Sequence, residues 1–118
     1  MMKTTAFGRF LRKLRIDHGM IMRDLAKVLG VSSAFVSALE LGKKAITEKH
    51  ITKIVEYFEL SNAETSELRK AAELSQPSLK LELNDKTMEQ RELAVSFARN
   101  YQNMSKEDQI KLMKLLEG

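Results

Sequence analysis

Apolar residues recur at three- and four-residue spacing through most of this chain, the pattern of helices that bury one face. Five such runs fall within the first 74 residues, and two more fall near residues 88–102 and 106–117. The first run extends from about Thr5 to His18 and is closed by Gly19. Its apolar positions are Phe7, Phe10, Leu11, Leu14 and Ile16. The pattern predicts a mainly α protein.

Capping residues support these helices. A Ser or Thr before an apolar run accepts a hydrogen bond from a free backbone N–H of the first turn, and a Glu or Gln three residues on completes a capping box. Ser32, Thr47 and Ser61 stand at such positions in the first part of the chain. Thr87 and Ser105 stand before the two C-terminal runs. We therefore expect helices that begin at these five residues.

The helical pattern is interrupted over residues 75–87, where Pro77 is the only proline of the chain. Apolar and polar residues then alternate over 79–83, which predicts a short half-buried strand with Leu79, Leu81 and Leu83 on one face. A lone strand leaves its backbone groups unpaired. Three arrangements remain open: a dimer strand that pairs with a second copy across a two-fold axis, addition to a partner protein, or an extended linker whose leucines lie over the first domain.

The expected organisation has three parts. Residues 1–74 form a five-helix domain, and residues 75–87 form a linker that contains the strand. Residues 88–118 form a helical segment that dimerises or binds a partner.

Residues 23–42, RDLAKVLGVSSAFVSALELG, contain two short helical runs that meet at Gly30. The turn at 30–32 is too short for two antiparallel helices to pack side by side. The second helix therefore leaves steeply, and its outer face can enter a DNA major groove. That face carries small or apolar residues: Ser33, Ala34, Phe35, Ser37 and Ala38. The run predicts a helix-turn-helix.

Together with FGRFLRKLR at 7–15 and the segment 46–60, this run resembles the lambda-repressor-like (Cro/CI, or xenobiotic-response-element) family of DNA-binding domains. The resemblance spans roughly the first 60–72 residues and implies five helices that bind double-stranded DNA. The chain departs from the family at two positions. Met22 replaces a Gln that often contacts phosphate, and Leu41 replaces a polar residue before the turn glycine.

The resemblance also implies roles for particular residues. Ser33, Ala34 and Ala38 match base-facing positions, with Phe35 and Ser37 flanking them. None of these side chains can make the bidentate base contacts of Arg, Asn or Gln, which leaves hydroxyl contacts, thymine-methyl contacts and DNA shape.

Further matches concern phosphate contacts and the scaffold. The candidates for phosphate binding are Arg23, Lys27, Ser32, Lys43 and Lys44. Arg15 and Glu40 match a structural ion pair that fixes the second helix of the motif on its scaffold.

Charge is distributed unevenly. Residues 1–45 hold nine basic and three acidic residues, a net +6, so the remainder contributes −2 to the total of +4. Positive potential therefore accompanies the helix-turn-helix, as binding to phosphates requires.

Other chemistry finds little support. The chain has no cysteine, which excludes disulfides and thiol chemistry, and its two histidines, His18 and His50, are too far apart for a metal site. No glycine-rich phosphate loop and no nucleophile with a nearby base occur, so we expect neither an enzyme nor a cofactor nor a metal. No signal peptide or membrane-length apolar run occurs, and we expect a cytoplasmic protein without membrane contact.

These observations predict a sequence-specific DNA-binding transcription regulator that acts as a homodimer on an inverted repeat. Repression is expected, because a small dimer without a sensor domain works most simply by occupying promoter DNA. The size and helical extension resemble antitoxins of type II toxin–antitoxin pairs or compact phage-type repressors. This resemblance implies autorepression and a toxin or a regulatory protease as a further partner. The alternative is a helical adaptor that captures a protein and does not bind DNA.

Overall fold

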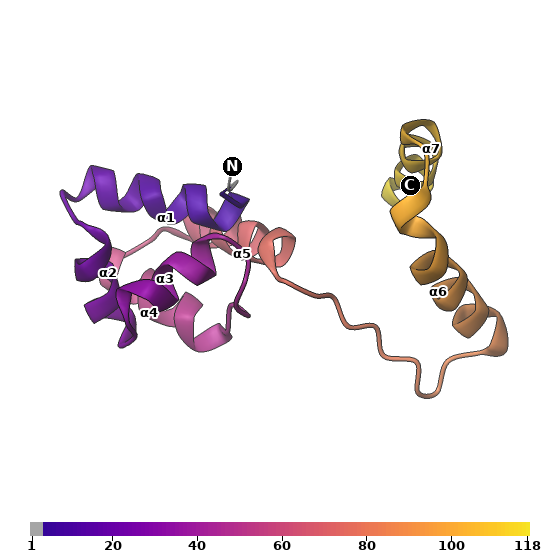
Figure 1. Cartoon of the computed structure of the whole chain (residues 1–118), viewed down its shortest axis with the longest axis horizontal. Coiled ribbons are helices and arrows are strands. Elements are labelled where there is room, and N and C mark those ends of the chain that lie inside the picture. The colour runs from indigo at the N-terminus through magenta and orange to yellow at the C-terminus, as the bar shows by residue number, and fades with distance from the viewer. Residues whose placement is uncertain (1–3) are drawn as a thin grey trace. The chain divides into compact units, whose positions relative to one another are not determined.

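The computed structural model describes residues 4–118, and every regular element among them is a helix (Figure 1). The mainly α prediction is confirmed. The chain divides into two compact units, and the boundary in the sequence falls between Leu79 and Lys80. Lys3, one of the nine basic residues counted above, lies outside the described residues. No helix in the described part of the chain is long and apolar enough to cross a membrane.

The first unit contains the five expected helices. They are α1 (Ala6–Asp17), α2 (Met22–Leu29), α3 (Ser33–Glu40), α4 (Glu48–Phe58) and α5 (Asn62–Ser75). The predicted caps hold: the hydroxyls of Ser32, Thr47 and Ser61 each accept a hydrogen bond from the backbone N–H three residues on. Short-range hydrogen bonding therefore sets where these helices begin.

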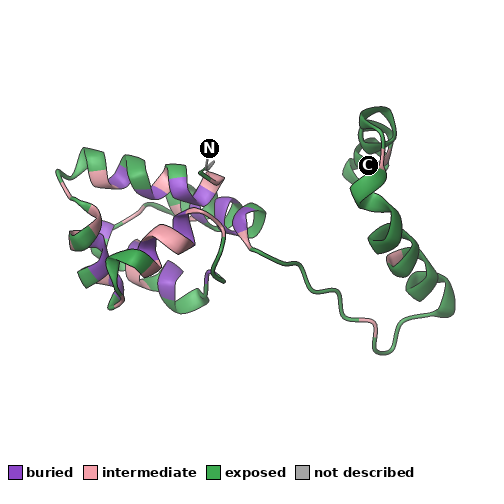
Figure 2. Cartoon of the chain, viewed as in Figure 1, coloured by how far each residue is buried: buried purple, intermediate pink, exposed green. Residues whose placement is uncertain are grey.

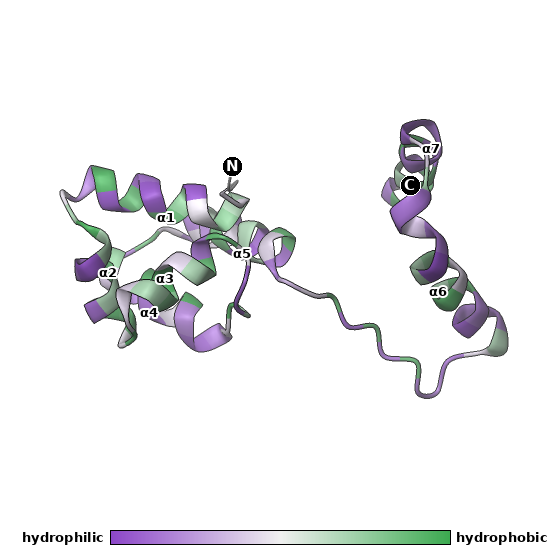
Figure 3. Ribbon diagram, in the orientation of Figure 1, coloured by the Kyte–Doolittle hydropathy of each residue, from purple (hydrophilic) through white to green (hydrophobic). Residues whose placement is uncertain are grey.

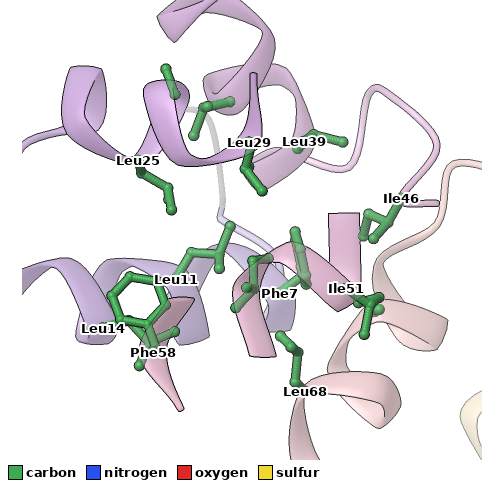
Figure 4. Close-up of a cluster of buried hydrophobic side chains, with 14 residues drawn as sticks. Phe7, Leu11, Leu14, Leu25, Leu29, Leu39, Ile46, Ile51, Phe58 and Leu68 are labelled. Atoms are coloured by element: carbon green, nitrogen blue, oxygen red, sulfur yellow. The ribbon is translucent and has the colours of Figure 1, made fainter. Parts of the chain in front are cut away.

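The core of this unit is built from the apolar stripes of all five helices (Figure 4). Its largest fully buried side chains are Phe7, Leu11, Leu25, Leu29, Val36, Leu39, Ile54 and Leu68. Burying one such side chain contributes roughly 1.5–3 kcal/mol relative to leaving it exposed. The first unit thus has a hydrophobic core of its own.

One expected core residue of α1 lies outside it. Ile16 was placed on the buried face, but it is 68% exposed. The buried stripe of α1 runs through Phe7, Leu11 and Leu14, at steps of four and three residues. Ile16 follows Leu14 by two residues, which turns its side chain to the opposite side of the helix.

α1 and α3 meet closely at Gly8. A Cβ atom there would overlap the carbonyl oxygen of Glu40, so only glycine allows this approach. The same carbonyl accepts hydrogen bonds from the backbone N–H and the hydroxyl of Thr5, at 3.3 and 2.8 Å. The start of α1 therefore holds the end of α3.

The end of α5 is fixed by two side chains. Ser75 is buried, and its hydroxyl accepts a hydrogen bond of 3.0 Å from the backbone N–H of Phe7. The amide of Gln76 bonds both the N–H and the carbonyl of Ile46, each at 2.8 Å. These bonds close the first unit by joining its last helix to α1 and to the loop before α4.

The predicted strand over 79–83 is wrong. The structure has no strand in residues 4–118, and 79–83 run without regular structure, with Leu79 and Leu81 exposed and Leu83 half-buried. The dimer strand of Leu79, Leu81 and Leu83 falls with it. Alternation records only which positions share a face, whereas a strand also needs a second strand to pair its N–H and C=O groups. This chain offers none in the part described.

The second unit consists of α6 (Met88–Asn100), a short 3₁₀ helix η1 (Tyr101–Asn103) and α7 (Lys106–Glu117). Thr87 and Ser105 cap α6 and α7 as expected, each accepting a hydrogen bond of 3.1 Å. No residue of Lys80–Gly118 is buried, in contrast to the first unit (Figure 2).

Candidate DNA-binding surface

The turn between α2 and α3 depends on Gly30. Its φ and ψ of 71° and 33° lie in the left-handed region, which costs a glycine little and ends α2 sharply. The backbone N–H of Val31 bonds the carbonyl of Ala26 at 3.0 Å across this turn. Lys53 of α4 donates a hydrogen bond of 3.1 Å to the carbonyl of Leu29, the last residue of α2. The Lys53 ammonium thus lies at the C-terminal end of α2, where the helix dipole favours a positive charge.

α3 shows two different faces. Val36 and Leu39 are fully buried in the core. On the other side, Ser33 and Ala34 are exposed. Ser37 and Ala38 are half-buried. The structure thus presents the small residues expected on the outer face.

Phe35 differs from its expected role. It is half-buried and packs against the core cluster, with its ring centroid 5.8 Å from that of His50. The Phe35 side chain therefore lies partly in the core and only partly on the outer face of α3. Its contact with α4 helps to fix α3.

The candidate phosphate contacts are all exposed and lie in the segments that precede and follow α3 in the chain. Arg23 and Lys27 belong to α2, and Lys43 and Lys44 follow α3 directly. Ser32 is exposed in the turn, where its hydroxyl accepts a hydrogen bond of 3.0 Å from the backbone N–H of Phe35. Exposed cations therefore lie on the helix before α3 and in the loop after it, whereas the exposed residues of α3 itself are uncharged.

The structure brings Arg15 and Glu40 together. Nη2 of Arg15 donates to both carboxylate oxygens of Glu40, at 2.9 and 3.1 Å. Burial raises the pKa of Glu40, and the guanidinium groups of Arg15 and Arg12 oppose this rise. Since Thr5 also bonds the Glu40 carbonyl, α1 holds the end of α3 by side chain and backbone alike.

The start of α2 departs from the family pattern. Met22, its first residue, is half-buried and packs against the core cluster, so its side chain serves packing in place of a polar contact. Asp24 supplies the polar contact at this helix start, because its carboxylate accepts a hydrogen bond of 2.9 Å from the backbone N–H of Ile21. Leu41, the second departure, is half-buried.

Several residues that support the helix-turn-helix were not predicted from the sequence. Thr5, Lys53 and Gln76 bond backbone atoms that lie 24 to 35 residues away in the sequence. No local spacing marks such contacts. Thr5 stands at the start of the first apolar run, but nothing in that position indicates a contact with α3.

Residues 11–62 match the helix-turn-helix family model. This segment of the chain is therefore similar to helix-turn-helix domains. The match includes α2, α3 and α4 whole, and it supports the Cro/CI-type family that the sequence resembles. It also supports a DNA-binding transcription regulator whose ligand is double-stranded DNA. No curated protein and no solved structure matches the chain.

The helix-turn-helix surface offers contacts suited to DNA. The exposed cations can neutralise phosphates, and the serine hydroxyls and alanine methyls of α3 can meet base edges. Among residues 4–118, no group of three or more acidic or histidine side chains could hold a metal ion.

Proposed function

We propose that this protein is a sequence-specific transcriptional repressor that binds an inverted-repeat operator as a homodimer and represses its own gene. One observation carries the proposal: the exposed residues of α3 are uncharged, whereas exposed cations lie on α2, the helix before it, and in the loop directly after it. A solvated helix ordinarily carries charges on its outer face. Here the cations lie on the neighbouring segments, which suits a helix that enters a major groove while the segments beside it meet phosphates.

The division of labour follows from the side chains. Arg23, Lys27, Lys43 and Lys44 contact phosphates, which supplies affinity and fixes the position of the domain. Ser33 and Ser37 hydrogen bond base edges, and Ala34 and Ala38 contact thymine methyl groups. Small side chains discriminate weakly at each base. DNA shape and the sum of two half-sites therefore supply the rest of the specificity.

A homodimer supplies the two DNA-binding domains that two half-sites require. Two recognition helices related by a two-fold axis read half-sites about 34–36 Å apart on one side of the duplex. Occupation of such a site within a promoter excludes the transcription machinery. The mechanism requires no catalytic residue, cofactor or metal.

Binding to the DNA upstream of its own gene tests the proposal. In a gel shift followed by footprinting, we expect protection of two half-sites related by dyad symmetry. Affinity should exceed that for a scrambled duplex by about 10³-fold or more. Equal affinity for both duplexes would overturn sequence-specific regulation, and binding to neither duplex would favour the adaptor.

An antitoxin role would add a second partner to the same repressor. The size and the helical extension of the chain support it by resemblance. Co-expression with the product of the adjacent gene, followed by purification on a tag, would test this role. Separate elution of the two proteins would contradict it.

A further inference from the structure

The second unit has no core of its own. Its 39 residues, Lys80–Gly118, include no buried side chain. Units of this size seldom fold alone and usually need disulfides, a metal or association with another chain. The sequence has no cysteine, and the described residues offer no metal-binding group. Association is the remaining means of stabilising α6 and α7.

Apolar residues occur along both helices among polar ones (Figure 3). Leu93, Phe97 and Tyr101 are spaced by four residues and lie along one face, and the rings of Phe97 and Tyr101 stack with centroids 5.7 Å apart. Phe97 and Tyr101 also line an open hollow with side chains from α7. We call the set the apolar face; it comprises Leu93, Phe97, Tyr101, Ile110, Met113 and Leu116, all of them exposed.

We infer that the apolar face is the surface on which a second copy of this chain docks. The first reason is charge. Lys80–Gly118 holds seven basic and seven acidic residues, a net charge of zero, whereas residues 1–79 hold thirteen and nine, a net +4. Two copies can therefore meet through their second units without net repulsion.

The second reason is area. Large side chains expose about 150–250 Å² each when fully open to solvent, so six side chains at 42–72% exposure present about 600 Å² per copy. Two copies would bury about 1,200 Å², which reaches the range of specific protein interfaces. The apolar face is thus large enough to hold a dimer together.

The dimer gives the second unit a role in DNA binding. This role rests on the proposed function, because a single helix-turn-helix domain reads only one half-site. The first unit has its own core and closes at Gln76, which leaves residues 77–87 as a tether between DNA binding and dimerisation.

Sedimentation of the full chain tests the inference. We expect a dimer at about 10–100 μM, and we expect Phe97→Lys and Leu116→Lys each to raise the dimer dissociation constant by about 30-fold or more. Leu74→Lys is the matched control, since Leu74 is an exposed leucine (74%) of α5 in the first unit. It should leave the dimer intact.

Circular dichroism gives a second readout. In the monomeric variants α6 and α7 should melt, with loss of about a third of the helical signal, because they hold 25 of the 78 α-helical residues in the part of the chain that the structure describes. The first unit should remain folded. A wild-type chain that sediments as a monomer would overturn the inference. The apolar face would then be covered by the first unit of the same chain or by another protein. A variant that carries both Phe97→Lys and Leu116→Lys and still sediments as a dimer would also overturn the inference.

The dimer and the proposed function can fail separately. A dimeric wild-type protein that does not bind DNA would leave the docking surface in place and remove the repressor. A monomeric wild-type protein that binds its operator would remove the docking surface and leave DNA binding in place.

Discussion

One guanidinium nitrogen of Arg15 bonds both carboxylate oxygens of Glu40, at 2.9 and 3.1 Å, and so joins α1 to the last residue of α3. The side chains of Arg15 and Glu40 are only 15% and 7% exposed. Burial of a charge is costly unless a partner compensates it. The ion pair therefore holds α3 against α1, and removal of either side chain leaves the other charge buried without a partner.

Glu40→Ala should lower the free energy of unfolding by about 3–5 kcal/mol, because it leaves the Arg15 charge buried without its partner. Chemical denaturation measures the loss. Arg69→Ala is the control: Arg69 pairs with Glu48 at 2.7 Å, but the two side chains are 51% and 68% exposed. That change should cost at most about 1 kcal/mol. Equal losses would show that the ion pair of Arg15 and Glu40 contributes no more than a surface pair. The double change Arg15→Met with Glu40→Leu should cost less than Glu40→Ala.

Ala34→Glu should abolish operator binding while leaving the melting temperature nearly unchanged. Ala34 is exposed on α3, so a carboxylate there would face the phosphates without disturbing the core. Ala63→Glu places the same charge on an exposed position of α5 and should bind the operator normally. Fluorescence anisotropy titrations of one labelled operator duplex measure the affinities of the wild type, Ala34→Glu and Ala63→Glu. Full affinity in Ala34→Glu would exclude α3 from the groove.

Local patterns predicted most of the fold. Caps such as Ser61 and Thr87 act within one helical turn, so their spacing alone located the helix starts. Periodicity found the buried stripes, although it placed Ile16 on the wrong side of α1. The ion pair of Arg15 and Glu40 came from the family resemblance, since 25 residues separate the two in the sequence.

The errors arise where an element depends on distant atoms. The alternation at 79–83 resembled a strand, but only a partner strand could have stabilised one. The helical pattern does break at Gln76, but no local pattern shows that the Gln76 amide joins the end of α5 to Ile46. Lys53 carries no local mark of its bond to Leu29. Such contacts follow from tertiary packing, and one sequence does not reveal them.

Salt dependence should report the phosphate contacts. If Arg23, Lys27, Lys43 and Lys44 each meet one phosphate in both copies, about eight contacts imply a log–log slope near −7. Lys27→Ala should flatten that slope by about one to two units and weaken specific and non-specific binding alike. Lys70→Ala, which removes an exposed cation from α5, should leave the slope unchanged. An unchanged slope in Lys27→Ala would remove that residue from the DNA interface.

His50 should make the first unit less stable in mild acid. Burial, together with the charges of Lys53 and Lys49, lowers the pKa of His50 below its ordinary value of 6.5. Its Nδ1 accepts a hydrogen bond of 3.1 Å from the backbone N–H of Thr47, and protonation would remove that acceptor. The unfolded chain therefore takes up the proton at a higher pH than the folded one. The stabilisation is complete above pH 6.5 and is lost as the pH falls through the folded pKa.

His50→Gln isolates this contribution, because the glutamine oxygen can accept the same hydrogen bond at the third position of α4 but does not titrate. Urea denaturation at pH 7.5 and at pH 5 should show a larger loss of unfolding free energy in the wild type than in the variant. All other titrating groups are common to both proteins and cancel in the comparison. Equal losses would mean that His50 takes up its proton as readily in the folded domain as in the unfolded chain. In that case Nδ1 would not be held as the acceptor for Thr47.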